Sequence, residues 1–453
     1  MRVMTLLLII FTCSVIYSQE MTPPASDQRI YDIISSCSAE RIEADITTLA
    51  GFGTRHTLSD TVSQTRGIGA ARRWIKAEFE RISADCGGCL EVSYQSGVIE
   101  EGQSRRIPVS TNIVNVLAVK RGTVYPDRYI IMSGDIDSRI SDPLNGVDDS
   151  PGANDNASGM AGVLEAARVL SPYDFASSII FVGLSGEEQG LFGGKIMAEQ
   201  AIEDSLDIIG ILNNDMIGNI TGIDGVIDNR TFRIFSEAAP PTENEQQRIW
   251  QRFYGGEVDG ISRQLARYVH RMVSSYMPNM NPMMIYRLDR FGRGGHHRPF
   301  NDVGFAGIRI MEAHENYNQQ HQDIRVEDGI QYGDRLEHVN FDYAAKLTAV
   351  NAIALASIAW APTPPEGLMI GGAVQPSTRL RWDDAEDSHI AGYKIYWRDT
   401  TSPQWQYSRY VGDLSDFTLE NIVIDNFLFG VVAVSADGHE SIVSFPTTLI
   451  PRR

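Results

Sequence analysis

The sequence predicts an α/β fold: a mostly parallel mixed sheet with helices on both faces, followed by a small all-β sandwich. Short apolar runs recur along the first part of the chain, and helical patterns lie between several of them. This alternation is typical of a parallel sheet flanked by helices. After residue 367 the pattern changes to short alternating runs, which are typical of a sandwich. A chain of 453 residues is long enough for two or three domains.

Four apolar runs are the expected strands of the large sheet, and polar residues follow each of them. The expected helices have apolar residues at helical spacing. In such sheets, functional sites lie beyond the carboxyl ends of the strands. The expected strands are Tyr129–Gly134, Ser178–Ser185, Ile208–Asn213 and Gly307–Met311, and the main expected helices are Gly67–Ile82, Ala157–Leu170, Leu191–Ile202 and Phe341–Trp360.

The chain divides into four predicted segments. Residues 1–18 are typical of a signal peptide, because Arg2 precedes an apolar run that is too short to cross a bilayer. The first domain covers 19–360, with an insertion at about 220–290 that contains polar helix material and a Met-rich stretch. A Pro-rich linker at 361–367 (APTPPEG) leads into a β-sandwich module at 368–453.

Charge and composition exclude some partners. The net charge of −19 argues against nucleic acid, since phosphate binding needs a basic surface. No later segment is apolar for long enough to predict a transmembrane helix. A signal peptide implies a secreted, periplasmic or cell-surface protein, in which disulfides are permitted. The spacing of Cys86-Gly-Gly-Cys89 favours a local disulfide, and Cys37 is then left over or takes one of the two as its partner.

Acidic residues and histidines follow the predicted strands. Because the carboxyl ends of these strands meet at one edge of the sheet, several carboxylates would gather there, which is costly without cations. Asp, Glu and His donors suit zinc and related divalent ions. The residues concerned are Asp135 and Asp137 after the first strand, Asp155 about twenty residues on, Glu187 and Glu188 after the second strand, Asp215 after the third, and His314 and His321 after the fourth.

Residues from about 110 to 355 resemble metallopeptidase family 28, the two-zinc aminopeptidases, which also contains glutaminyl cyclases. The resemblance implies a zinc-exopeptidase-like fold and a metal-dependent exopeptidase that hydrolyses N-terminal peptide bonds of peptides or proteins with metal-activated water. The N-terminal segment adds the expectation that this enzyme is secreted. The matching motifs are SGDIDSR, PGANDNASG, SGEEQGLFG, NNDMIG, and GHHRPFNDVGFAGIR followed by ENYNQQHQD.

The resemblance implies a metal role for five positions. Asp155 would bridge two metal ions, and Glu188 and His321 would complete one site. Asp215 would serve the other site together with the residue at 135. The family usually has His at that place, whereas this chain has Asp135. An all-oxygen site favours harder ions than zinc, so we expect the second metal to bind more weakly or to be another ion.

The resemblance also implies two roles outside the metal shell. Glu187 would be the general base that activates the attacking water, and Asp137 would orient the ligand two positions before it. The pair His296-His297 stands where the family often has Asp-His, and it is left out of the metal shell. His314 is the reserve for His321 as the last ligand.

Two other functions stay open. One is a glutaminyl-cyclase-like activity, which in this family needs only one metal. The other is an inactive cell-surface homologue that binds through its C-terminal module. That module resembles a fibronectin type III domain in Trp382, the strand Gly392–Trp397 and the run FGVVAVSADGHES. An extracellular or cell-surface partner for this module is therefore part of the expectation.

Overall fold

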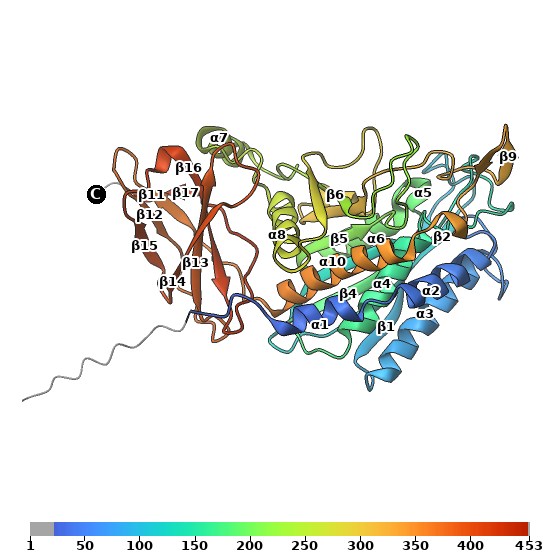
Figure 1. The fold of residues 1–453 in the computed structure, drawn as a ribbon, viewed down its shortest axis with the longest axis horizontal. Coiled ribbons are helices and arrows are strands. Elements are labelled where there is room, and N and C mark those ends of the chain that lie inside the picture. Colours follow the sequence, from blue (N-terminus) through green and yellow to red (C-terminus); the bar gives the residue numbers. More distant parts are fainter. Residues whose placement is uncertain (1–21, 452–453) are drawn as a thin grey trace, which may run out of the picture.

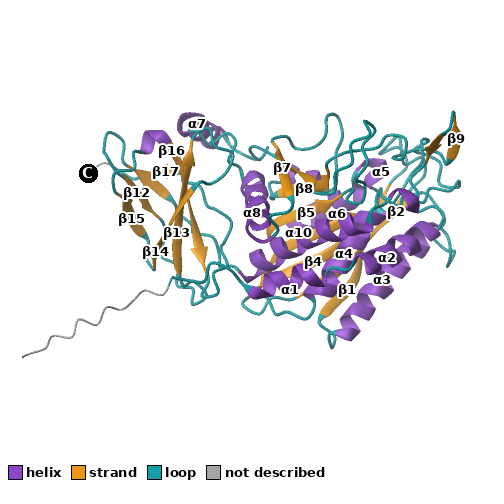
Figure 2. Cartoon of the chain, viewed as in Figure 1, coloured by secondary structure: helices purple, strands orange, loops and turns teal. Residues whose placement is uncertain are grey.

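The structure is a computed structural model that describes residues 22–451. The predicted signal peptide at 1–18 lies outside these residues. Figure 1 shows a large α/β part and, beside it, a smaller β part formed by the C-terminal residues. Figure 2 shows the same division, with helices packed over strands in the large part and strands dominating the small one.

An eight-stranded mixed sheet forms the centre of the large part, in the order β1-β2-β4-β3-β5-β8-β6-β7. Its middle strands β4, β3, β5 and β8 are parallel to one another, while β1, β2 and β6 join through antiparallel pairs. The bounds are β1 Leu90–Ile99, β2 Thr111–Lys120, β3 Tyr125–Asp135, β4 Ser177–Leu184, β5 Asp207–Asn214, β6 Thr231–Ser236, β7 Asn281–Ile285 and β8 Gly307–Glu312.

Helices cover both faces of this sheet, as predicted. On β3, Ile130 and Met132 pack into the larger core with α4 and α10, while Tyr129 and Ile131 pack into the smaller core with α6 and α9. This alternation follows from the two-residue period of a strand. The bounds are α1 Gln28–Ser36, α2 Ala39–Gly51, α3 Gly67–Asp85, α4 Ala157–Leu170, α5 Glu187–Gly190, α6 Phe192–Glu203, α7 Glu245–Tyr254, α8 Ile261–Tyr276, α9 His297–Asp302, η1 Leu336–His338 and α10 Phe341–Trp360.

Helix α10 has the length and apolar composition of a membrane-spanning helix. Within the described residues, α10 is the one helix long and apolar enough to cross a membrane, and it is almost entirely buried inside the protein, as a core helix would be.

The structure places a disulfide between Cys86 and Cys89, and Cys37 has no disulfide partner in the described part of the chain.

The segment predicted as an insertion, about 220–290, is integrated into the fold. Its strands β6 and β7 extend the main sheet, and α8 packs against α10. Its helix α7 contacts the C-terminal part, where the Trp250 indole N–H donates to the carbonyl of Pro446 at 2.9 Å. Local sequence did not reveal this, because strand pairing at a sheet edge depends on partners far away in the chain.

Two small sheets form the C-terminal part, in the orders β15-β12-β11-β17 and β14-β13-β16. Leu380, Trp382, Ile395 and Phe429 lie in their shared core. The all-β prediction is thus confirmed, while the resemblance to fibronectin type III stays a prediction. The remaining bounds are the hairpin β9 Arg325–Glu327 and β10 Ile330–Tyr332, then β11 Met369–Gly371, β12 Thr378–Arg381, β13 Gly392–Asp399, β14 Tyr407–Gly412, β15 Asp416–Leu419, η2 Ile424–Asn426, β16 Phe427–Val434 and β17 Thr448–Leu449.

A buried charge cluster joins the two parts. The carboxylate of Asp259, just before α8, accepts two hydrogen bonds from Arg398 of β13, at 2.6 and 2.8 Å, and is also paired with Arg267 of α8. All three side chains are at most 1% exposed. Two guanidiniums therefore share one carboxylate at the contact between the parts.

We expect Asp259→Ala to lower the free energy of unfolding by about 3–5 kcal/mol, because it leaves buried guanidiniums without their carboxylate. Urea unfolding followed by circular dichroism measures this. Glu257→Ala is the matched control, since Glu257 is exposed and lies two residues away. Equal stability of the two variants would contradict the structural role of the cluster.

Candidate metal centre

The strands and turns of the sheet bring the predicted site residues to one edge. β3 ends at Asp135, and Asp215 follows β5 directly. β4 ends at Leu184 and is followed by Gly186, whose φ of 74° allows a sharp turn into α5. This turn places Glu187 and Glu188 in the first turn of α5. The residues come together because β4, β3, β5 and β8 run in the same direction.

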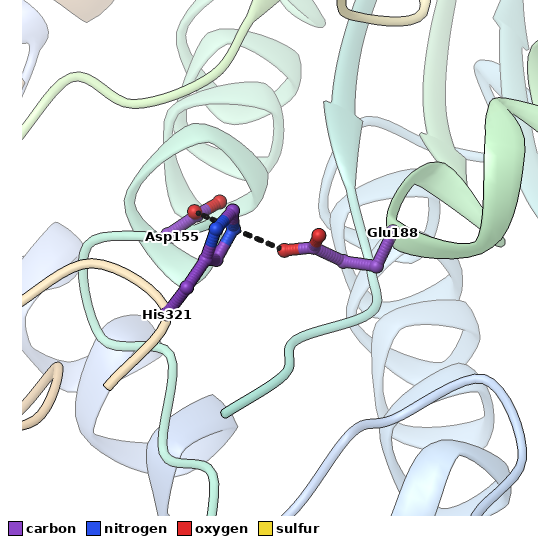
Figure 3. Close-up of side chains that lie close together, drawn as sticks. All are labelled: Asp155, Glu188 and His321. Carbon is purple, nitrogen blue, oxygen red and sulfur yellow. Dashed lines mark hydrogen bonds and ion pairs between the residues drawn. The ribbon is translucent and has the colours of Figure 1, made fainter. Parts of the chain in front are cut away.

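Three side chains form a compact donor group: Asp155, Glu188 and His321 (Figure 3). The His321 Nε2 atom lies 2.9 Å from Glu188 Oε1 and 3.0 Å from Asp155 Oδ2. Their donor atoms all lie within 4.8 Å of one another, and no other such group of three His, Cys, Asp or Glu residues occurs within residues 22–451. Two carboxylate oxygens and one imidazole nitrogen fit a zinc ion.

Hydrogen bonds hold this group in place. Arg139 donates to Glu188 Oε2 at 2.6 Å, and another of its nitrogens lies 2.7 Å from His321 Nδ1. Gln320 donates to Asp155 Oδ2 at 3.0 Å. Burial lowers the pKa of His321, but the charges of Glu188 and Asp155 outweigh this and raise that pKa to about 9. These outer contacts therefore orient Asp155, Glu188 and His321 toward one another.

Glu187 lies beside this group and lines the same cavity, whose volume is about 460 Å³. Burial raises the pKa of Glu187 well above its ordinary value, and the nearby charges of Glu188 and Asp215 raise it further. A carboxylate with a raised pKa at a cavity wall is suited to accept a proton and return it. Glu188, one residue on, has its pKa lowered by His321 and Arg139 despite burial.

Asp137 contacts the turn that carries the two glutamates. Its Oδ1 accepts from the backbone N–H of Glu187 at 3.2 Å, and its Oδ2 accepts from that of Glu188 at 3.1 Å. The hydroxyl of Thr57 donates to the same Oδ2 at 3.0 Å. Asp137 therefore positions the start of α5, whereas the resemblance implied that it orients residue 135.

The structure does not bring Asp135 to the donor group. Its Oδ2 accepts from the Asn156 amide at 2.8 Å, and its Oδ1 lies 2.6 Å from His296 Nδ1. Burial lowers the pKa of His296 to about 4, so its ring is neutral near pH 7. Aspartate is shorter than histidine, and both oxygens of Asp135 already have partners.

Asp215 lines the cavity but is paired with a cation from the protein itself. Arg309 Nη2 lies 2.8 Å from Asp215 Oδ2, and Arg309 also pairs with Asp289 at 3.1 Å. Arg309 is fully buried on β8, while Asp215 Oδ1 is buried without a hydrogen-bond partner in the described residues. The three residues predicted for a second ion, Asp135, Asp155 and Asp215, therefore do not form a ready donor set.

Sequence reasoning missed two arginines of this site. Arg309 interrupts the apolar run GIRIM, and a charged residue in a buried strand indicates a buried partner. Arg139 stands in the quoted motif SGDIDSR, but nothing local to it pointed to Glu188. His314, the reserve ligand, lies outside the group, 3.9 Å from Asp228.

Three comparisons place the chain among known proteins. The model of "Peptidase family M28" matches residues 115–334. A protein of Pyrenophora tritici-repentis described as a probable zinc metalloprotease is 40% identical over 94% of this chain and 88% of its own length. Among solved structures, the Legionella pneumophila LapA aminopeptidase covers 75% of this chain and 77% of its own, with a TM-score of 0.53 and 16% identity. The Macrostomum lignano glutaminyl cyclase covers 74% and 93%, with a TM-score of 0.50 and 14% identity.

The two structural likenesses bear on the fold alone, because their sequence identities are low. The family model covers the four parallel strands and every residue of the donor group. The fungal relative is similar along nearly the whole chain, including the C-terminal β part. This chain is therefore a metallopeptidase that belongs to peptidase family M28.

Proposed function

We propose that this protein is an aminopeptidase-like exopeptidase that removes N-terminal residues from peptides, with Glu187 as its general base. The observation that carries the proposal is the position of Glu187 in the same cavity as Asp155, Glu188 and His321. A cavity of about 460 Å³ lies within the size range of small-ligand sites, and the end of a peptide is a ligand of this kind. The N-terminal pattern at 1–18 supports export, and the Cys86–Cys89 disulfide is compatible with an oxidising compartment.

The residues of the site divide the work. Asp155, Glu188 and His321 would hold the ion, which when bound lowers the pKa of water and polarises the scissile carbonyl. Glu187 takes the proton of the attacking water and gives it to the leaving amine. Arg139 and Asp137 keep Glu188 and Glu187 in position through the contacts described above.

The donor set supports one ion rather than two. Both oxygens of Asp135 have partners, and Arg309 already supplies a positive charge beside Asp215. A second cation beside Asp215 would have to compete with this buried guanidinium. We therefore propose a single zinc ion at the group of Asp155, Glu188 and His321.

We expect His321→Ala to weaken zinc binding by more than the roughly 10- to 100-fold that loss of an outer partner costs, because it removes a direct donor. Competition with a fluorescent chelator measures the affinity. His314→Ala is the matched control, because His314 lies in the same loop region but outside the group. Equal zinc affinities in the two variants would remove His321 from the site.

We expect about one zinc per chain in protein purified without added metal, as a consequence of the single complete donor set. Elemental analysis after dialysis measures the ratio, with the His321→Ala variant as the blank. Two ions that survive dialysis would contradict the single-ion proposal.

We expect Glu187→Gln to lower kcat/KM by about 100- to 10,000-fold while zinc content is unchanged, because the amide cannot accept the proton. The assay uses aminoacyl nitroanilides and peptides that begin with glutamine. Glu199→Gln, an exposed change on α6, is the control. Undiminished turnover would exclude Glu187 as the base.

The same assay separates the other functions. Ammonia release from glutamine peptides without amino acid release would favour the cyclase. Zinc-loaded wild-type protein without turnover on any substrate would favour the binding homologue.

A further inference from the structure

The cavity above the donor group has an unusual charge distribution for so acidic a chain. Although the net charge is −19, six cationic side chains line this cavity. Three of them have a carboxylate partner in the protein. Arg139 pairs with Glu188, and Arg290 and Arg293 both pair with Glu315. The other three are Arg106, Lys195 and Arg298.

These three cations have no carboxylate within ion-pair distance among residues 22–451. Arg106 donates to the backbone carbonyl of Glu188, and Arg298 Nη1 donates to that of Arg293 at 3.5 Å. Lys195 Nζ lies 5.0 Å from the centre of the Phe192 ring. Carbonyls and rings do not cancel a full charge, so each of these three side chains keeps its positive charge.

Arg106 and Lys195 are exposed, but their origin sets them apart from side chains that are scattered over a solvated surface. Arg106 comes from the loop between β1 and β2, Lys195 from α6 and Arg298 from α9. Three separate elements thus converge on one cavity. Arg298 is half-buried, and its Nε is fully buried without a hydrogen-bond partner in the described part of the chain.

The acidic groups of the cavity do not match these cations. Asp155 and Glu188 face His321, and Asp215 faces Arg309. Glu187 also lines the cavity and, within the described residues, forms no ion pair with any of the three cations. Asp302 is exposed on the same wall, four residues from Arg298, but is not within ion-pair distance of it. The three cations therefore form a local positive region of the wall, and a local excess of one sign attracts a ligand group of the opposite sign.

We propose that this cavity selects peptides that carry a carboxylate next to the scissile bond, with Arg106, Lys195 and Arg298 as its binding side chains. This inference rests on the proposed exopeptidase function. A guanidinium binds a carboxylate through two parallel N–H···O bonds, which makes arginine well suited to the role. The carboxylate is either the side chain of an acidic residue or the free C-terminus of a very short peptide.

The test compares matched peptides that differ in one carboxylate. Ala-Ala against Ala-Ala-amide probes a terminal carboxylate. Asp-Ala-amide against Asn-Ala-amide, and Ala-Glu-amide against Ala-Gln-amide, probe an acidic side chain on either side of the bond. We expect kcat/KM to favour the charged member of at least one pair by about 10- to 100-fold, as charge-assisted hydrogen bonds do.

Substitution of the three cationic side chains tests whether they cause the preference for the charged peptide. We expect Arg298→Gln to reduce the preference and the triple variant Arg106→Gln, Lys195→Met, Arg298→Gln to abolish it. Arg105→Gln is the matched control, because Arg105 is exposed, adjacent in sequence and outside the cavity lining. A preference that survives the triple variant, or wild-type ratios near one in all pairs, would overturn the inference while leaving the peptidase intact.

If none of these peptides is cleaved, that result contradicts the proposed exopeptidase function instead. Calorimetric titration of the zinc-loaded protein with the same peptides then tests the inference alone. Tighter binding of the charged member, lost in the triple variant, supports it, and equal binding of both members overturns it.

Discussion

Mutual repulsion of carboxylates at one sheet edge is the constraint on which the site depends. Four parallel strands end together there. β3 ends at Asp135, and the segments after β4 and β5 carry Glu187, Glu188 and Asp215. Burial and proximity raise the pKa of Asp135, Glu187 and Asp215 well above the ordinary values. Such a cluster is stable only if positive charge or hydrogen-bond donors reach each carboxylate.

Positive charge or hydrogen-bond donors reach Glu188, Asp215 and Asp135 in three different ways. His321 and Arg139 face Glu188 and leave a compact group that an ion can occupy. Asp215 has Arg309, whose guanidinium is fully buried on the central strand β8. Asp135 has hydrogen-bond partners rather than a cation, since His296 is neutral near pH 7. The three solutions explain why only one part of the edge resembles a complete metal site.

The rest of the molecule supports this edge. The helices on both faces of the sheet fix the strands, and α10 supplies an almost fully buried support to the larger core. Helices α6 and α9 pack on the opposite face and also present Lys195 and Arg298 to the cavity. The C-terminal β part contacts α7 and α8 through Trp250 and the Asp259 cluster, and it contacts α10 through His439, whose Nδ1 lies 3.1 Å from the Ser357 hydroxyl. None of these residues lines the cavity.

The sequence by itself determined several of the elements and the chemical character of the site. The helices at 157–170 and 341–360 occur at their predicted bounds, because their apolar spacing is a local property. The motifs after the strands likewise predicted which residues would gather at the edge. Strand periodicity shows where a strand ends, and in a parallel sheet this places the residues that follow it.

Only the tertiary structure decided which partner each charged residue has. Asp135 contacts His296, 161 positions away, and Arg309 reaches the backbone carbonyl of Asp215, 94 positions away. The tertiary structure also decided the position of β6 and β7. The sequence suggested an insertion there, but both strands pair at the edge of the main sheet. Local sequence patterns indicate whether a side chain is buried and on which face of its helix or strand it lies. The partner of a buried charge is set by long-range packing, because any nearby cation or donor can satisfy it.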